Sequence, residues 1–345
     1  YGESIYTSRF ELIGNYQLPV KENMNLAFSY TYHNQNSVYG NTFYLANQKI
    51  AFGQYTWDKK IQNHDFLLGG AFRYQYYNDN TIATEKPEKT KIYSLFLQDE
   101  IKLTDNKSVL LGSRYDYNNN HGSIFTPRIA YKWKPNQNSV FRINAGTGFR
   151  VVNLFTEDHA ALTGAREVVI AEELKPEQSY NGNINYQRYI NFNKGFINLD
   201  ISGFYTYFTN KIIGDFDTDP NKIIYDNLSG HAVSAGASLN ADISFAFPLK
   251  INAAVTYCKV YAVEKDSTGK KVRTQQVHAP EWSGTFSVAY TFNKIGLTID
   301  WNGQWNGPMR LPVLPNDYRP EYSPWHCLMN IQATKKFKFG LEIYG

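Results

Sequence analysis

The chain has 345 residues, of which 42% are hydrophobic and 16% aromatic, and its mean hydropathy is −0.48. It contains no run of about 18 apolar residues, which excludes a membrane-spanning helix, and its net charge of only +4 argues against nucleic acid, which needs a concentrated basic patch. The aromatic excess, 27 Tyr and 22 Phe, fits a barrel with an aromatic girdle at each membrane interface.

Apolar and polar residues alternate with period two along much of the chain, which predicts strands with one apolar face. The first clear run lies at 24–33, where side chains from Met24 to Tyr32 alternate with those from Asn25 to His33. Further runs lie at 197–207, 282–292 and 295–304. In a soluble sandwich the turns at both edges would have similar lengths, and here they do not.

Short and long connections alternate between the runs. Short polar turns are expected at 19–23, 58–63, 104–107, 134–138, 191–194, 247–250, 293–294 and 336–339. Longer connections are expected at 34–42, 78–89, 118–123, 149–177, 210–221, 263–280 and 307–323. This pattern describes roughly sixteen strands of about 10–15 residues, long enough to cross a membrane when tilted. We therefore predict an all-β fold, a transmembrane antiparallel up-and-down β-barrel, which leaves no exposed sheet edge.

Charged residues within the predicted strands share the parity of the polar face. Burying Arg or Lys in lipid costs about 2–4 kcal/mol. Arg114, Asp116 and Arg128 are therefore expected to face the lumen, where water or a plug contacts them. The same parity places Cys258 inward and Cys327 outward, so we expect no disulfide between them.

Five motifs follow one another between residues 97 and 179. They are Leu97-Gln-Asp-Glu-Ile-Lys-Leu-Thr-Asp105, Leu111-Gly-Ser-Arg-Tyr-Asp116, Thr126-Pro-Arg-Ile-Ala-Tyr-Lys-Trp133, Gly146-Thr-Gly-Phe-Arg150 and Leu174-Lys-Pro-Glu-Gln-Ser179. Their order and spacing resemble the barrel portion of TonB-dependent outer-membrane receptors, and flanking strands extend the resemblance over most of the chain. The stretch 155–166 is similar to receptors of the Bacteroidetes group.

This resemblance implies a barrel of about 22 strands, with an N-terminal plug inside it and a TonB-contacting box before the plug. The sequence shows neither plug nor box, so residues 1–345 are expected to form a partial barrel domain that lacks several first strands and the last. The implied location is the bacterial outer membrane, with long loops extracellular and short turns periplasmic. The implied partners are the TonB–ExbB–ExbD complex, the lipid bilayer and a surface lipoprotein; neither nucleic acid nor enzymatic activity is expected.

The longest outer connection carries the densest group of chelating side chains, Glu157, Asp158 and His159. Carboxylate and imidazole can ligate a metal or hydrogen-bond a chelate. The alternative is helix capping, with Thr156 as the N-cap and acids in the first turn. The other candidate ligand contacts, for which packing within the loops is the alternative, are Phe155, Arg166, Tyr225, Tyr318 and Arg319.

Three acids alternate at Asp215, Asp217 and Asp219. Hard oxygen ligands at this spacing suit calcium, but neither the glycine nor the distant glutamate of an EF-hand loop accompanies them. A solvated acidic loop is the alternative. No other cofactor is expected.

The resemblance implies active uptake of a scarce nutrient, and the group at Glu157, Asp158 and His159 favours a metal-containing one, such as an iron–siderophore, haem or another metal chelate. A cobalamin receptor of the same family is the alternative within this class. A passive porin is the alternative of another class, and it predicts rapid diffusion of small sugars into liposomes. A soluble propeller would need a repeat of about 40–50 residues, which is absent. No motif points to a hydrolase, although separate strands could still assemble Ser, His and Asp.

Overall fold

The computed structural model describes residues 3–40, 42–81, 84, 86–151, 167–215, 218–219, 221–265, 268–313 and 318–345. These residues form twenty β-strands joined by turns and loops. They contain no helix that is long and apolar enough to cross a membrane. The chain divides into two compact units. The N-terminal unit comprises Tyr1–Ala130, Gly146–Ser179 and Thr209–Ser229, and the C-terminal unit comprises Tyr131–Ala145, Tyr180–Phe208 and Gly230–Gly345.

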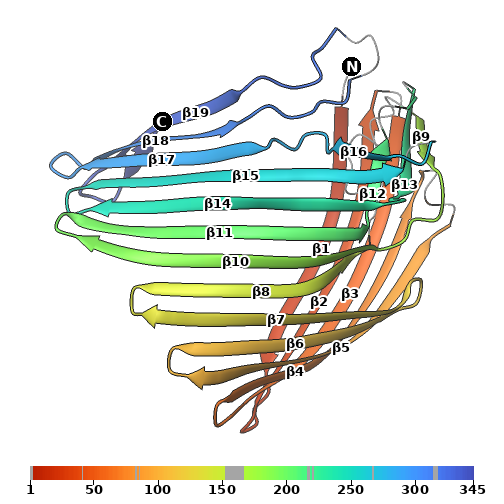
Figure 1. Cartoon of the computed structure of the whole chain (residues 1–345), viewed down its shortest axis with the longest axis horizontal. Helices are drawn as coiled ribbons and strands as arrows, with labels where there is room; N and C mark the ends of the chain where they lie inside the picture. The colour runs from red at the N-terminus through yellow and green to blue at the C-terminus, as the bar shows by residue number, and fades with distance from the viewer. Residues whose placement is uncertain are drawn as a thin grey trace. The chain divides into compact units, whose positions relative to one another are not determined.

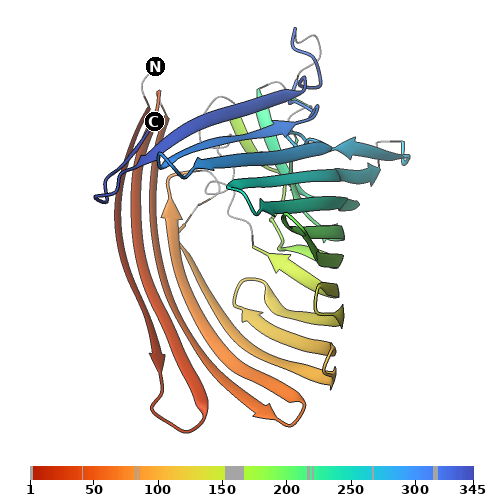
Figure 2. The same cartoon turned by 90° about the vertical axis from the view of Figure 1, so that its left-hand side faces the viewer.

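The N-terminal unit is built on a six-stranded antiparallel meander. Its strands are β1 (Glu3–Gln17), β2 (Asn23–Tyr39), β3 (Thr42–Ile61), β4 (His64–Asp79), β5 (Glu88–Thr104) and β6 (Lys107–Asn118). Each pairs with the next in register along most of its length, and the first strands, coloured red to orange, run side by side in Figure 2. Four further strands contribute residues to both units: β7 (Gly122–Asn136), β8 (Ser139–Arg150), β10 (Glu177–Phe192) and β11 (Gly195–Asn210).

The C-terminal unit continues in the same manner. Its own strands are β14 (His231–Phe245), β15 (Leu249–Lys265), β16 (Lys271–Gln275), β17 (Trp282–Phe292), β18 (Leu297–Asn306), β19 (His326–Lys336) and β20 (Glu342–Tyr344). Antiparallel pairing runs from β11 through β14, β15, β17 and β18 to β19, and the short β16 and β20 pair with β15 and β19 (Figure 1).

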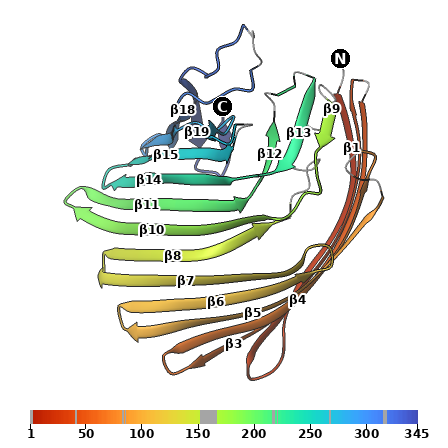
Figure 3. The same cartoon turned by 45° about the vertical axis from the view of Figure 1, so that its right-hand side comes forward.

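A second, small sheet lies within the N-terminal unit. It contains β9 (Glu167–Ile170), β12 (Ile212–Asp215) and β13 (Lys222–Asn227). β13 pairs antiparallel with β12 and parallel with β9 (Figure 3). Val168, Ile223 and Tyr225 of this sheet form a buried cluster with Tyr44 and Ala46 of β3.

Each unit has one apolar and one polar face, and the apolar face is the exposed one. In the N-terminal unit Leu95 lies opposite Tyr115, and the two are 66% and 43% exposed. On the other face Ser94 lies opposite Asp116, which is 1% exposed. A soluble protein shows the reverse arrangement. Exposed apolar rows on tilted strands are expected where lipid covers the sheet.

The C-terminal unit has the same two faces. Val288 of β17 lies between Ile251 of β15 and Trp301 of β18, which makes an apolar row across three strands. On the opposite face Asp242 of β14 accepts hydrogen bonds from Asn198 (3.2 Å) and Asn252 (2.6 Å). The period-two alternation therefore predicted the two faces correctly.

All eight predicted short turns are confirmed, since each falls where one strand ends and its antiparallel partner begins. Gln62, with φ of 52°, lies in one of them, and Gly195, with φ of 154°, directly follows another; both have backbone conformations that favour glycine. Fifteen strands are 10–20 residues long, close to the predicted number and somewhat longer than predicted. Cys258 is partly buried and Cys327 is exposed, and both are free thiols.

The prediction of long connections at 34–42 and 118–123 is wrong. β2 continues to Tyr39 and β3 begins at Thr42, while β6 ends at Asn118 and β7 begins at Gly122. Asn34 and its neighbours are polar on both faces, which hides the alternation although their backbone still pairs. Alternation reports what each face contacts and not whether the backbone is paired.

Strands also occur where the sequence predicted loops. β16 lies inside the connection expected at 263–280, and β9 and β12 lie inside those expected at 149–177 and 210–221. Of these three segments, β9 pairs with a strand far away in the chain, β13, and local patterns carry no information about such pairing. β12 and β16 instead form short hairpins with β13 and β15. The helix-capping interpretation of Thr156 falls on residues outside the described ranges.

Candidate functional site

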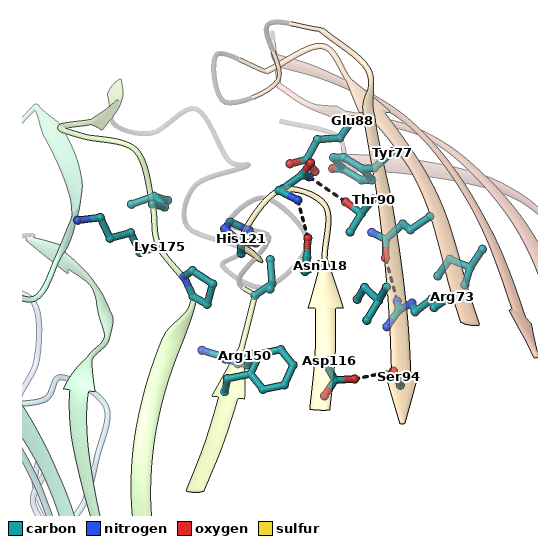
Figure 4. Close-up of a pocket in the computed structure, with 18 of the residues that line it drawn as sticks. Arg73, Tyr77, Glu88, Thr90, Ser94, Asp116, Asn118, His121, Arg150 and Lys175 are labelled. Carbon is teal, nitrogen blue, oxygen red and sulfur yellow. Dashed lines mark hydrogen bonds between the residues drawn. The ribbon is translucent and has the colours of Figure 1, made fainter. Parts of the chain in front are cut away.

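A cavity of about 1170 Å³ lies on the polar face of the N-terminal unit. Alternate residues of β4, β5 and β6 line it, because period-two alternation directs every second side chain to this face. Arg73, Ser94, Asp116 and Asn118 point into it (Figure 4). The other residues of β2 to β6 that line it are Ser29, Thr31, Ile50, Phe52, Ala71, Gln75, Tyr77, Glu88, Thr90, Ile92 and Arg114.

The deepest polar group joins three of these side chains. Asp116 accepts two hydrogen bonds from Nε of Arg114, both 2.9 Å, and a third from Oγ of Ser94 at 2.5 Å. Arg114 also donates from Nη2 to Ser94 Oγ at 2.8 Å. Asp116 is only 1% exposed, so its carboxylate depends on these donors in place of water. The guanidinium of Arg114 lies 5.7 Å from the ring centre of Phe96.

Asn118 continues the same polar row towards the turn between β6 and β7. Its Oδ1 accepts the backbone N–H of Asn120 at 2.9 Å, and Asn120 in turn donates to Thr90 at 3.3 Å (Figure 4). The side chain of Asn118 is 1% exposed, and its Nδ2 has no hydrogen-bond partner among the described residues. A buried amide donor facing a cavity requires a partner, and a ligand or a water can supply it.

The rim of the cavity joins two of the sequence motifs. Arg150, which ends β8, donates from Nε to Oε2 of Glu177, which begins β10, at 2.9 Å. Glu177 is 5% exposed, and its Oε1 accepts the backbone N–H of Ile212 at 3.1 Å. Burial lowers the pKa of nearby Lys211, and the carboxylate of Glu177 opposes that shift. One carboxylate therefore holds together β8, β10 and the start of β12.

The small sheet fixes a second part of the rim. Ile170, Leu174 and Ile212 pack against its buried cluster and also line the cavity. Asn227 anchors the intervening segment, because its Oδ1 accepts the N–H of Lys175 at 2.8 Å and its Nδ2 donates to Glu172 at 2.6 Å. That hydrogen bond lowers the pKa of Glu172.

Tyrosine side chains support the cavity from β3 and β4. The hydroxyls of Tyr44 and Tyr77 are 2.9 Å apart, and Tyr77 donates to Asp79 at 2.6 Å. Both rings are 3% exposed. The Tyr77 hydroxyl therefore joins the neighbouring tyrosine to the carboxylate of Asp79.

The cavity carries charges of both signs. Arg73, Lys86, Arg114, Arg150 and Lys175 are basic, and Glu88, Asp116, Glu172 and Glu173 are acidic. Asp116 already pairs with Arg114, and Glu177 pairs with Arg150. Such a surface can orient a polar, charged ligand through hydrogen bonds. Within the described ranges no group of three or more His, Cys, Asp or Glu could hold a bare metal ion.

The structure places the predicted residues in different environments. Arg114 and Asp116 line the cavity, whereas Arg128 lies over Gly112 and hydrogen-bonds Gln98 without lining it. Tyr225 is buried in the small sheet's cluster at 3% exposure. Tyr318 is 96% exposed and Arg319 is exposed beside it. Phe155, Glu157, Asp158, His159 and Arg166 lie outside the described residues.

The proposed calcium ligands form turns where they are described. Asp215 accepts hydrogen bonds from the backbone and hydroxyl of Thr218, and Asp219 accepts the N–H of Asn221 at 2.8 Å. These are the local turns that aspartate side chains commonly make. Asp217 lies outside the described ranges.

Sequence reasoning did not identify Arg73, Asn118 or the Arg150–Glu177 pair as parts of one site. Asn118 has the parity of Asp116, two residues earlier, so the polar row could have been extended to it. The ion pair was harder to foresee, because its partners belong to two motifs that the sequence showed only as consecutive.

Strands with a lipid-suited apolar face and a polar opposite face that bears a large charged cavity define the class: a membrane β-barrel. The particular family follows from comparison. Residues 3–345 match the model of the family described as "TonB dependent receptor-like, beta-barrel", and the chain belongs to this family of outer-membrane receptors.

Known proteins with similar sequence or structure agree with this assignment. An iron-regulated outer membrane virulence protein of Vibrio cholerae is 29% identical over 128 residues, which cover 35% of this chain and 19% of that protein. A ferric enterobactin receptor variant of Pseudomonas aeruginosa has a TM-score of 0.73 at 13% identity, covering 99% of this chain and 55% of the other. The siderophore receptor PirA of P. aeruginosa gives 0.70 at 14%, covering 99% and 60%.

The matched part is therefore a portion of each relative. The chain spans 19% of the curated relative's length and 55–60% of the two solved structures. Sequence identity at this level to the solved structures shows the fold alone.

Proposed function

We propose that the full-length protein is an outer-membrane receptor that actively imports a scarce metal-containing nutrient, with an iron chelate as the first choice. The observation that carries this proposal is the cavity of about 1170 Å³ on the polar face of the N-terminal unit. It exceeds the roughly 300–1,000 Å³ of common small-molecule pockets. Its basic groups suit a bulky ligand that bears carboxylate, phenolate or hydroxamate oxygens.

Three features support a chelate in particular. Asn118 presents a buried donor that needs a partner, and Arg73 and Lys175 bring positive charge to opposite sides of the opening (Figure 4). The described residues offer hydrogen-bond donors but no metal cluster, which suits a metal already wrapped by its chelator. The relatives are named for iron regulation, ferric enterobactin and siderophores. Cobalamin is the alternative ligand of the same kind.

In this proposal the short turns face the periplasm and the end with the small sheet faces outward. Energy reaches the receptor from TonB–ExbB–ExbD through a plug and a TonB box in another part of the protein. Arg114, Asp116 and Arg128 contact that plug, and a surface lipoprotein assists capture. The similarity of 155–166 to receptors of the Bacteroidetes group supports an origin in that group.

On the outer connections we propose the same ligand contacts that the sequence predicts. Glu157, Asp158 and His159 are the central group, with Phe155 and Arg166 beside them. Tyr318 and Arg319 are exposed. Tyr225 would act through the small sheet, because its own ring is buried. Calcium at Asp215, Asp217 and Asp219 is a subsidiary proposal.

The test is uptake by cells that depend on the full-length receptor for iron. Cells given one iron chelate, haem or cobalamin at a time should take up at least one of these in a TonB-dependent manner. Replacing Glu157, Asp158 and His159 together with alanine should lower that uptake while the barrel still assembles. Asn118→Ala should weaken it about tenfold, since a buried donor to a ligand contributes about 1–2 kcal/mol.

The matched control is Asn240→Ala, which removes an amide from the polar face of the C-terminal unit and should leave uptake unchanged. Liposome swelling with small sugars completes the test. Rapid sugar diffusion through the full-length protein, with no TonB-dependent uptake of any of the three nutrients, would show a passive porin and reject the proposal.

A further inference from the structure

We propose that the C-terminal unit carries a binding site for the phosphate-bearing head groups of the surrounding lipid leaflet, formed by Lys259 and Arg273. This inference rests on the proposed outward direction of the long connections, and it concerns the lipid side of the sheet, away from the cavity for the imported ligand. Its evidence comes from register, side-chain contacts and charge within the C-terminal unit alone.

The register places these residues on the lipid-facing side. On β15, Ile251 and Tyr257 share the apolar face and pair with Val288 and Trp282 of β17. Lys259 follows Tyr257 by two residues, and two residues on a strand keep the same face. Lys259 therefore continues the lipid-facing row of β15.

Aromatic rings mark where the apolar row ends. The rings of Tyr257 and Trp282 are 4.8 Å apart, and Trp282 is 43% exposed on the apolar face. Tyr and Trp in such positions lie at the membrane interface, level with the head groups. Lys259 lies about 7 Å further along the strand, since each residue adds about 3.3 Å. Its amine, 5.7 Å from the ring centre of Tyr257, is then at head-group depth.

Arg273 is held for planar recognition of an anion. It pairs in register with Val263 of β15, and its guanidinium stacks 3.5 Å from the ring centre of Tyr261. Stacking fixes the plane and leaves the N–H edge available, which matches the oxygens of a phosphate. No carboxylate among the described residues lies within ion-pair distance of Arg273 or Lys259.

The surrounding pocket has a volume of about 450 Å³. Arg310 and Glu321 form its far side and largely neutralise each other at 3.6 Å. Tyr322 donates to Gln275 at 3.3 Å and closes one end. Glu281 is the remaining acid. Lys259, Arg273 and Arg310 against Glu281 and Glu321 leave the pocket with a net charge of +1, above an apolar surface that would meet the acyl chains.

The test uses the full-length receptor in detergent, titrated with bisphosphorylated lipid A and with the same lipid after dephosphorylation, and read by native mass spectrometry. The wild type should bind the phosphorylated lipid more tightly. The Lys259→Gln/Arg273→Gln variant should bind it about 25-fold more weakly, since each basic residue near a charged lipid surface contributes about 1 kcal/mol, or about fivefold.

The matched control is Lys134→Gln/Lys194→Gln, which removes the same charge from the short turns at the opposite end of the strands. It should bind as the wild type does. If the double variant fails to assemble, each single change should still give about fivefold. Arg273→Lys should be intermediate, since it keeps the charge and loses the planar fork.

Two outcomes would overturn the inference. One is equal binding of phosphorylated lipid by the wild type and a folded Lys259→Gln/Arg273→Gln variant. The other is inorganic phosphate alone binding as tightly as the lipid, which would identify a free-anion site. Neither outcome depends on nutrient uptake, so failure here is distinguishable from failure of the proposed receptor function.

Discussion

The polar faces of the two units differ in chemistry although the same alternation produces both. In the N-terminal unit the face is ionic, with Asp116 buried beneath Arg114 beside a large cavity. In the C-terminal unit amides dominate, as where Asn198 and Asn252 both donate to Asp242. The apolar faces of the two units are alike. The apolar face is therefore determined by the general need to contact lipid. The polar face differs between the units because different polar residues occupy it.

The largest difference between the units should appear when one partner of a polar group is removed. Arg114→Ala leaves the Asp116 carboxylate, 1% exposed, without its counter-charge. We expect a loss of about 3 kcal/mol in the free energy of unfolding, at the low end for buried pairs because Arg114 is itself 41% exposed. Asn252→Ala, in the amide network, should cost about 1 kcal/mol.

Urea unfolding of the full-length protein in detergent or lipid, followed by tryptophan fluorescence, would measure both. Equal losses for the two variants would show that the ionic and amide faces are energetically equivalent. An Asp116→Asn/Arg114→Ala double variant should recover part of the loss, because it removes the uncompensated charge.

A second test compares the two faces of one strand. Val288→Lys puts a charge into the apolar row between Ile251 and Trp301, and we expect it to cost about 2–4 kcal/mol. Ser287→Lys, its neighbour on the polar face, should stay within about 0.5 kcal/mol. Assembly into vesicles followed by unfolding measures both, and matching costs would contradict the assignment of the lipid side.

A third, smaller effect concerns the rim of the cavity. Glu177→Ala removes the acceptor of the Ile212 N–H and the partner of Arg150, and should cost about 2 kcal/mol. Hydrogen exchange at the Ile212 amide should accelerate. Glu177→Gln keeps an acceptor and should cost about half as much. Unchanged exchange at Ile212 in the alanine variant would show that this carboxylate does not hold β12.

The smallest expected effect is the pH dependence of one exposed turn. Hydrogen bonds from Lys59 and then Trp57 lower the pKa of Glu22 below its usual 4.5. A lowered folded-state pKa adds stability above the unfolded value, and this stability is lost as the pH falls through the folded pKa. Between about pH 5 and pH 3, the wild type should therefore lose slightly more thermal stability than Glu22→Gln. The measurement is the melting temperature of each protein as a function of pH. An equal decrease for the two proteins between about pH 5 and pH 3 would contradict the lowered pKa of Glu22.

Local patterns predicted much of this fold and little of its site. Parity placed Arg114 and Asp116 correctly on the polar face, because two-residue alternation is a property of each strand alone. It missed the small sheet, since Val168 and Ile223 come together only through pairing that is distant in the chain. It also missed how Arg150 meets Glu177, because two motifs in sequence order give no distance between their side chains.

The parallel pairing of β9 with β13 has a consequence for the order of folding. The pairing joins Glu167 to Lys222, so it can form only after a long stretch of chain has been organised. Its three short strands bury few residues and should open at lower free energy than the long hairpins. A protein built this way is expected to secure its long strands first and to complete the small sheet beside the cavity last.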